Sequence, residues 1–246
     1  GNLAVSDFVD NPESDTGIKA PLELVLCDPK ANGCGLLQLR HTVSNEAMYR
    51  NYWYRSGINQ TMIDELEDIS RKAANVAGLQ SGDFVIDIGA NDGTLLRGYK
   101  VQGLNTVGFE PARNLYDYGK IGTTKIISDF FNHTAWANSF GQQKAKVITA
   151  IGMFYDLDDP RSFLKDVLEI IDDDGILVLQ MSYTPLMINQ LAFDNICHEH
   201  VWYYSLFNIK KLIEEKKLKG QFYSCSAPAW AKLGLAFNFE DSWQLH

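Results

Sequence analysis

The sequence predicts an α/β protein built on a doubly wound, parallel sheet. Three observations lead to this fold class. Short β-rich runs recur between residues 83 and 183, and helical segments or loops lie between them. An amphipathic helical pattern precedes the first run, and a glycine-containing turn follows it. Strands separated by crossovers of this kind favour a parallel sheet with both faces covered.

The β-rich runs are five: DFVIDIG, NTVGFE, TKIISDF, AKVITAIGMF and GILVLQMSY. Upstream of them, apolar residues recur at spacings of three and four, which predicts a helix from Asn59 to Gly78. A second helix is predicted from Leu206 to Leu218. The apolar positions of the first helix are Met62, Leu66, Ile69, Ala73 and Val76.

Composition excludes several functional classes. The 246 residues are 46 % hydrophobic, which is enough for a substantial core. With 22 basic and 31 acidic residues, the net charge of −9 favours neither nucleic acid nor an anionic membrane as a partner. No run reaches the roughly 18 apolar residues of a membrane span, and the first 20 residues do not resemble a signal peptide. We therefore expect a cytoplasmic protein, either a monomer or a homodimer.

The stretch FVIDIGANDGTLLRG carries the strongest local signal. A buried strand ends in Asp87-Ile88-Gly89, a tight turn contains Asn91, Asp92 and Gly93, and a helix follows. Glycines let the backbone turn sharply next to a ligand, and a helix N-terminus offers free N–H groups. The spacing differs from the dinucleotide pattern G-x-G-x-x-G. A carboxylate at Asp87 would repel a pyrophosphate but suits the ammonium and sulfonium groups of S-adenosylmethionine.

Two further acids follow later strands. Glu110 comes 21 residues after Gly89, where an acid accepts hydrogen bonds from ribose hydroxyls, and Asp129 follows the third strand, where an adenine amino group can be bound. In this order the motifs resemble the class I (Rossmann-like) methyltransferases. The predicted cofactor-binding residues are Asp87, Gly89, Asn91, Asp92, Gly93, Glu110, Pro111 and Asp129.

The segment FDNICHEHVWYYS follows the fifth strand, where a loop lies over the ligand crevice of an open α/β sheet. If it is extended, His198 and His200 point to one side and Glu199 to the other. Three interpretations remain open. The histidines bridge the loop to the core, or they bind a metal with Cys197 as the nearest third ligand, or one of them is an acid–base catalyst oriented by the carboxylate.

Several motifs resemble, in the same order, the sugar C-methyltransferases that act on NDP-4-keto-6-deoxyhexoses. They are YWYRSGINQTM, VIDIGANDGTLL, GFEPARN, FDNICHEHVWYYSL and the cysteine hairpin leading to CGLLQLRH, and they span about residues 20 to 218. The resemblance implies methyl transfer from S-adenosylmethionine to the carbon beside the keto group, through an enolate, with S-adenosylhomocysteine as product. It implies His200 as the base, Glu199, His198 and Tyr54 in the catalytic set, and Tyr52 and Arg55 at the sugar.

The same resemblance implies a small N-terminal zinc domain with two cysteine pairs. Only Cys27 and Cys34 match, on a predicted β-hairpin with a zinc-ribbon-like appearance, and His41 is a weak third candidate. The sequence also differs from the family pattern at MFYDLDD, where many of these sugar C-methyltransferases have F-x-H. Because the chain begins with Gly1 and ends in an unfamiliar tail, we expect truncation at both ends. The expected organisation is a zinc-domain remnant over 1–50, the methyltransferase domain over 51–220 and an atypical tail over 221–246.

Other functions remain open at this point. An O- or N-methyltransferase of a small molecule would use the same cofactor. A truncated, non-catalytic S-adenosylmethionine-binding module would explain the missing terminal parts. An NAD-dependent sugar enzyme is disfavoured by the glycine spacing.

Overall fold

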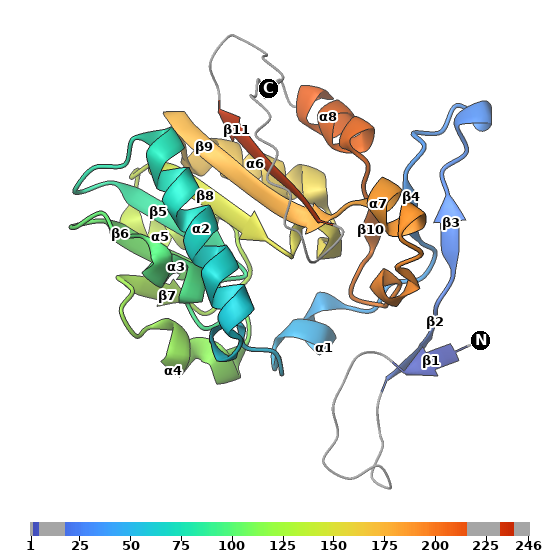
Figure 1. The fold of residues 1–246 in the computed structure, drawn as a ribbon, viewed down its shortest axis with the longest axis horizontal. Helices are drawn as coiled ribbons and strands as arrows, with labels where there is room; N and C mark the ends of the chain where they lie inside the picture. Colours follow the sequence, from blue (N-terminus) through green and yellow to red (C-terminus); the bar gives the residue numbers. More distant parts are fainter. Residues whose placement is uncertain (1, 5–17, 216–231, 239–246) are drawn as a thin grey trace, which may run out of the picture.

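The computed structural model describes residues 2–4, 18–215 and 232–238, and its centre is one twisted sheet (Figure 1). The strand order is β11-β9-β8-β5-β6-β7. The parallel strands are β5 (Phe84–Ile88), β6 (Asn105–Phe109), β7 (Lys125–Ile127), β8 (Ala145–Ile151) and β9 (Ile171–Ser182). The predicted doubly wound sheet is therefore confirmed.

One edge of the sheet differs from expectation. The tail has no clear side-chain period, yet β11 (Lys232–Asn238) pairs antiparallel with β9 over its whole length. This pairing satisfies backbone groups along the edge, a need that side-chain periodicity does not reveal. The rest of the predicted tail lies outside the described residues.

Helices cover both faces of the sheet and create two apolar cores. On one face α2 (Gln60–Ala77) and α3 (Thr94–Gly98) pack with Val85, Val147 and Ile176. On the other face lie α5 (His133–Phe140), α6 (Pro160–Ile170) and α8 (Leu206–Glu215), around a larger core. Figure 1 shows α2 crossing in front of the sheet. The central strands β5 and β8 are thus largely buried on both sides, as a parallel sheet requires.

Both predicted helices are confirmed where the structure describes them. The side chain of Asn59 accepts a hydrogen bond from Met62 N and caps α2, and Gly78 ends this helix in the left-handed conformation. The second helix begins at Leu206 as predicted and is described to Glu215. Its predicted last turn lies outside the described residues.

The predicted N-terminal β-hairpin is confirmed, and a short strand that follows the fifth strand of the main sheet pairs with it. Strands β3 (Leu24–Leu26) and β4 (Leu37–Leu39) are antiparallel, and β10 (Trp202–Tyr203) pairs with the other edge of β4. The remaining elements are β1 (Asn2–Ala4), β2 (Lys19–Pro21), α1 (Asn45–Tyr49), α4 (Tyr116–Gly119), α7 (Thr184–Asn189) and the 3-10 turns η2 (Pro29–Ala31), η3 (Ser56–Ile58), η4 (Arg113–Leu115), η5 (Phe154–Asp156) and η6 (Phe193–Asn195).

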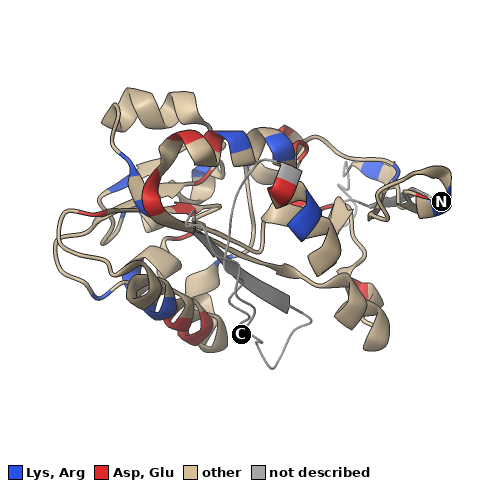
Figure 2. Cartoon of the chain, turned by 90° about the horizontal axis from the view of Figure 1, so that it is seen from above, with Lys and Arg blue, Asp and Glu red and all other residues tan. Residues whose placement is uncertain are grey.

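Charged side chains of both signs are interspersed along the helices (Figure 2). Within the described ranges, none of the helices combines the length and the apolar character needed to span a bilayer.

Candidate active site

A cavity of about 700 Å³ lies at the carboxyl ends of β5, β6 and β8, within the size range of small-molecule sites. Its wall is largely apolar and aromatic, and the described residues that line it include no Lys or Arg. Such a wall favours a ligand with positive charge. The six carboxylic acids that line it are Glu46, Glu110, Asp156, Asp158, Asp159 and Asp166.

The glycine turn forms one end of this cavity. Gly89, Asn91 and Gly93 all have left-handed backbone angles, with φ of 71°, 52° and 79°. The amides of Gly89 and Ala90 both donate to the carbonyl oxygen of Phe109, which fixes the turn against β6. Gly89 and Asn91 line the cavity. The turn thus brings backbone close to any bound ligand, as the sequence predicts.

Glu110 is held in a fixed position beside the turn. Its Oε2 accepts a hydrogen bond from Asn91 N and its Oε1 accepts one from Ala112 N, both at 2.7 Å. Burial raises the pKa of this carboxyl, and the two amide donors oppose the rise. Each oxygen keeps a further lone pair for a ribose hydroxyl. Glu110 and Pro111 line the cavity, so the residues present fit an adenosyl cofactor.

Two predicted cofactor acids are not brought to the cavity wall. Asp87 is only 4 % exposed and accepts a hydrogen bond from Thr149 Oγ1 at 2.6 Å. Burial raises its pKa to about 7, although the Thr149 hydroxyl lowers it. Asp129 instead accepts from Phe130 N at 2.9 Å and lies 3.4 Å from Arg50 Nη2. Neither residue contributes to the lining.

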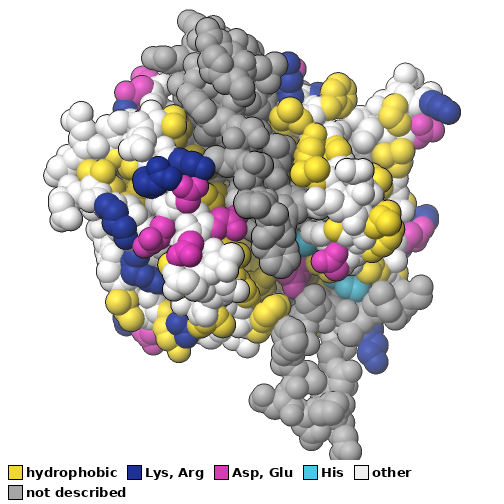
Figure 3. Space-filling model, in the orientation of Figure 1, with side chains coloured by type: hydrophobic (Ala, Val, Ile, Leu, Met, Phe, Trp, Pro, Cys, Tyr) yellow, Lys and Arg dark blue, Asp and Glu magenta, His cyan; other side chains and the backbone are white. Residues whose placement is uncertain are grey.

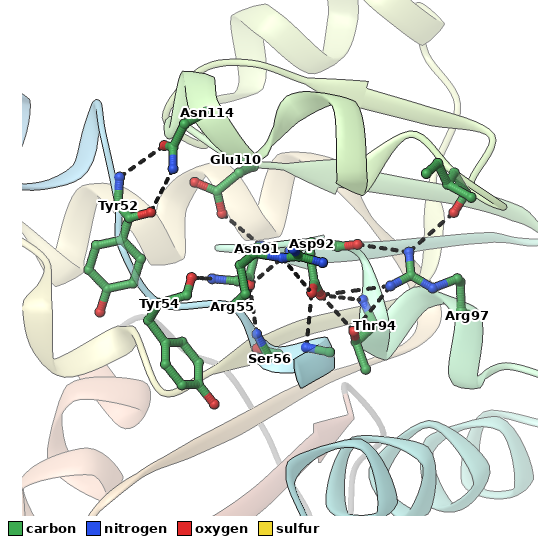
Figure 4. A network of polar contacts seen from close by, with 12 residues as sticks. Tyr52, Tyr54, Arg55, Ser56, Asn91, Asp92, Thr94, Arg97, Glu110 and Asn114 are labelled. Carbon is green, nitrogen blue, oxygen red and sulfur yellow. Dashed lines mark hydrogen bonds and ion pairs between the residues drawn. The ribbon is translucent and has the colours of Figure 1, made fainter. Parts of the chain in front are cut away.

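Residues 52–57, here called the strap, are clamped to the glycine turn (Figure 4). Asn91 Nδ2 donates to the Tyr54 carbonyl oxygen at 2.9 Å, and Asn91 Oδ1 accepts from Ser56 N at 3.0 Å. Gly57 N donates to Asp92 Oδ2 at 2.9 Å. A Cβ on Gly57 would lie only 2.7 Å from that oxygen, so the close approach requires glycine. Tyr52 and Tyr54 therefore line the cavity from a fixed backbone.

Asp92 and Arg55 belong to this clamp and do not line the cavity, and Gly93 does not line it either. Asp92 is 1 % exposed and accepts from Thr94 Oγ1 at 2.6 Å. Arg55 Nε lies 3.6 Å from Asp92 Oδ2, and the Arg55 guanidinium lies 3.7 Å above the centre of the Tyr118 ring. The structure thus places Arg55 against the turn and outside the cavity lining.

The HEH segment (His198–His200) lies at a bend over residues 197–199, so the condition of an extended segment is not met. His198 is 3 % exposed, and its Nε2 donates to the Ala20 carbonyl oxygen at 3.1 Å. This contact bridges the loop to β2. Glu199 Oε2 accepts from the Tyr52 hydroxyl at 3.2 Å, and the His200 ring packs edge-on against Tyr155, with centroids 4.4 Å apart.

Glu199 and His200 therefore contact residues of the cavity wall without lining the cavity themselves. On the face drawn in Figure 3, histidine side chains lie beside acidic ones. His198 and His200 face different neighbours. Among residues 2–4, 18–215 and 232–238, there is no group of three or more His, Cys, Asp or Glu that could hold a metal ion, so the metal interpretation of the HEH segment gains no support.

The protonation of His200 follows from its neighbours. Its Nδ1 lies 2.7 Å from the Asn195 carbonyl oxygen. Because a carbonyl can only accept, Nδ1 carries the hydrogen and Nε2 is left as the proton acceptor. Burial lowers the pKa of His200, and the Asn195 carbonyl and the charge of Glu199 oppose this. The ring is thus a neutral imidazole at pH 7.

Three polar wall residues near the HEH segment are among those that the sequence analysis missed. Tyr49, Tyr155 and Asp156 all line the cavity. Two hydrogen bonds join residues 155–157 to the chain directly after the HEH segment. Val201 N donates to the Tyr155 carbonyl oxygen at 3.0 Å, and Trp202 Nε1 donates to the Leu157 carbonyl oxygen at 2.6 Å. The departure MFYDLDD, which contains two of the three, was the available signal.

The expected zinc half-site has a simpler local role. Cys34 N donates to Cys27 Sγ at 3.2 Å, and hydrogen bonds from Cys34 lower the pKa of Cys27. His41, the weak third candidate, lies 3.7 Å from Glu23. The described part of the chain therefore supplies no complete zinc site.

The strand order, the glycine turn and the acid-lined cavity together define a class I methyltransferase fold, with S-adenosylmethionine as the cofactor that fits the site. Residues 54–219 match the family model described as a methyltransferase domain. The chain belongs to this family.

Individual relatives agree with this assignment. The chain is similar to the C-methyltransferase NovU of Streptomyces niveus, with 26 % identity over 210 residues, which are 84 % of this chain and 49 % of the relative. It thus spans about half the length of that relative. Among solved structures, the plantazolicin methyltransferase BpumL in complex with SAH has a TM-score of 0.55 at 10 % identity, covering 71 % of this chain and 82 % of that one. A methyltransferase solved with the Haloferax volcanii Trm112 activator has a TM-score of 0.52 at 13 % identity, covering 74 % and 95 %.

Proposed function

We propose that this chain is a C-methyltransferase that uses S-adenosylmethionine to methylate a nucleotide-linked keto-deoxysugar. The observation that carries the proposal is a half-buried, neutral His200 whose Nε2 has no hydrogen-bond partner among the described residues and whose ring packs against the wall of a cavity that suits a cation. Similarity to NovU supports a carbon acceptor. The HEH segment and the YRSG segment (Tyr54–Gly57) resemble those of the sugar C-methyltransferases. This resemblance supports a nucleotide sugar as the substrate class.

The cofactor would be held by residues at the turn end of the cavity. Glu110 offers carboxylate lone pairs to the ribose hydroxyls, and Gly89, Asn91 and Pro111 form the wall beside it. When bound, S-adenosylmethionine supplies an electrophilic methyl group. Behind this wall, Asp92 and Gly93 help to fix the turn. Asp87 bonds to Thr149 of β8, and Asp129 lies beside Phe130.

His200 would act on the substrate. Its Nε2 accepts the proton from the carbon beside the keto group, while the C–H electron pair forms the enolate double bond and the carbonyl π pair moves to oxygen. A neutral imidazole is required for this step, and burial provides it. Glu199 favours the imidazolium that forms, and it holds the Tyr52 hydroxyl. His198 positions the loop through Ala20.

Deuterium exchange tests this assignment. In D2O, the wild type should incorporate deuterium at the carbon beside the keto group of an NDP-4-keto-6-deoxyhexose. His200→Ala should slow exchange by about 10² to 10⁴-fold, while calorimetry still detects S-adenosylmethionine binding. His41→Ala, which changes an exposed histidine, is the matched control.

Other outcomes point to the rival functions. Methyl transfer without exchange would indicate an O- or N-methyltransferase. Cofactor binding with neither exchange nor transfer would indicate a non-catalytic module. Preference for NAD over S-adenosylmethionine in calorimetry would contradict the cofactor.

A further inference from the structure

Two buried polar atoms in the cavity wall have no hydrogen-bond partner among the described residues. They are Tyr49 Oη and Asp156 Oδ1, and both residues line the cavity. Buried polar atoms without partners are rare in folded proteins, and at a ligand site they mark positions where a ligand supplies the partner. The wall thus offers an unpaired hydroxyl and an unpaired carboxyl oxygen to a substrate.

The two side chains are neighbours that come from different elements. Tyr49 ends α1, whose N-terminus is capped by Ser44, and Asp156 ends η5. The Tyr49 hydroxyl is close enough to influence the Asp156 carboxyl, but the geometry of the pair falls short of a hydrogen bond. The two groups therefore converge on the cavity without satisfying each other.

Asp156 is also held beside the catalytic loop. Hydrogen bonds from Val201 N to the Tyr155 carbonyl oxygen and from Trp202 Nε1 to the Leu157 carbonyl oxygen flank it on both sides. The same loop carries His200, whose ring packs on Tyr155. Asp156 is thus fixed near the proposed base by main-chain contacts.

Burial and the surrounding negative charge favour the protonated forms of both groups. Burial, followed by the charge of Glu199, raises the pKa of Asp156 well above its usual range, and the Tyr49 hydroxyl opposes this. Burial, followed by the charge of Asp156, raises the pKa of Tyr49. The wall therefore presents two O–H donors where an acidic side chain would ordinarily be an acceptor.

We propose that the Tyr49 hydroxyl and the Asp156 carboxyl form the oxyanion hole for the enolate oxygen of the substrate. This inference rests on the proposed function and adds the donors that the reaction requires. As His200 Nε2 takes the proton from carbon, the carbonyl π pair moves to oxygen, and that oxygen accepts both hydrogen bonds. Both O–H protons stay on the enzyme. A tyrosine with a protonated aspartate stabilises an enolate in the same way in an unrelated enzyme.

Three substitutions test the proposal by their rates of deuterium exchange. Asp156→Ala removes a donor and should slow exchange by about 10² to 10³-fold. Asp156→Asn keeps a neutral N–H donor of similar shape and should retain exchange within about 10-fold of the wild type. Tyr49→Phe should slow exchange by about 10² or more. Asp117→Asn, which changes an exposed aspartate, is the control.

The pH profile gives a readout that a structural role would not change. Because the donor must be protonated, exchange in the wild type should fall as pH rises through the raised pKa of Asp156. This basic limb should vanish in Asp156→Asn, since an amide does not titrate. The titratable groups that face Asp156 from the surrounding elements are Tyr49, Tyr52, Tyr155, Cys197, Glu199 and Tyr203.

Several results would overturn the oxyanion hole. Asp156→Asn as slow as Asp156→Ala would mean that the carboxylate charge matters, and wild-type exchange in Asp156→Ala would mean that Asp156 has no role. Infrared spectroscopy tests the donor without substrate, because the wild type at pH 7 should show a protonated-carboxyl band that Asp156→Asn lacks. Absence of this band overturns the proposal. Failure of the wild type to exchange any keto sugar overturns the proposed function instead, and unfolding curves identify variants that do not fold.

Discussion

The two ends of the cavity differ in how completely their polar groups are satisfied, although Arg55 Nε in the clamp also has no hydrogen-bond partner among the described residues. At the turn end, Asn91 donates from its backbone and side-chain nitrogens and accepts twice at Oδ1, and Asp92 accepts from two neighbouring segments. At the other end, formed by α1 and η5, Tyr49 Oη and Asp156 Oδ1 have no hydrogen-bond partner within the described ranges. The first end is rigid before any ligand arrives, which suits a cofactor that must be held in one orientation. The second end is completed by the substrate, which suits chemistry.

This difference has an energetic side. An unsatisfied buried polar group costs about 1–3 kcal/mol of folding free energy, so the Tyr49 and Asp156 end destabilises the free enzyme. The hydrogen bonds of the turn end offset part of that cost. Substitutions at the turn end should therefore reduce stability and cofactor binding together, whereas those at the other end should change the reaction with little loss of stability.

The largest effect is expected from Asp92→Ala, which would break the clamp. It leaves the Gly57 amide and the Thr94 hydroxyl without their acceptor and removes the carboxylate near Arg55. We expect a loss of about 3 kcal/mol in the free energy of unfolding, measured by urea denaturation. Cofactor affinity by calorimetry should fall at least about tenfold, equivalent to 1.4 kcal/mol, because Asn91 loses its support.

Asp117→Ala is the matched control for this change. Asp117 pairs with Lys120 at 2.6 Å, but its side chain is 81 % exposed. Exposed pairs contribute about 0–1 kcal/mol, so the control should stay close to the wild type. A similar small change in Asp92→Ala would show that the turn end does not depend on the clamp.

Tyr52→Phe should have an intermediate effect, because Tyr52 belongs to both ends. Its backbone is fixed by Asn114, and its hydroxyl donates to Glu199 in the HEH segment. Loss of that hydrogen bond should cost about 1 kcal/mol and slow deuterium exchange by roughly fivefold. Cofactor affinity should remain unchanged.

The exposed Tyr116 provides the comparison, since Tyr116→Phe removes a hydroxyl far from Glu199. Equal exchange rates in Tyr52→Phe and Tyr116→Phe would mean that the hydrogen bond from Tyr52 to Glu199 does not contribute to the exchange reaction. A weakened cofactor affinity in Tyr52→Phe would instead mean that the Tyr52 hydroxyl contributes to cofactor binding.

The turn end was largely predictable from sequence, whereas the other end was not. Gly89, Asn91 and Glu110 follow strands at spacings that parallel sheets impose, so their meeting at one edge could be deduced. The environment of His198 could not be deduced, because its ring bonds to Ala20, which is far away in sequence. Asp156 was missed because its importance arises from burial and from the absence of a partner, and local patterns do not encode either property.

Arg55→Lys should have the smallest effect, and it sharpens the boundary between the two ends. Arg55 stacks over Tyr118 and lies 3.6 Å from Asp92 Oδ2, a distance at which it forms an ion pair without a hydrogen bond from Nε. Lysine keeps the charge but loses the planar stacking surface, which is worth about 0.5–1 kcal/mol at an exposed site. Urea denaturation should register this loss, while the KM for the sugar stays at the wild-type value because Arg55 does not line the cavity. A raised KM with unchanged stability would mean that Arg55 contacts the substrate. The strap would then contribute to substrate binding as well as to the clamp.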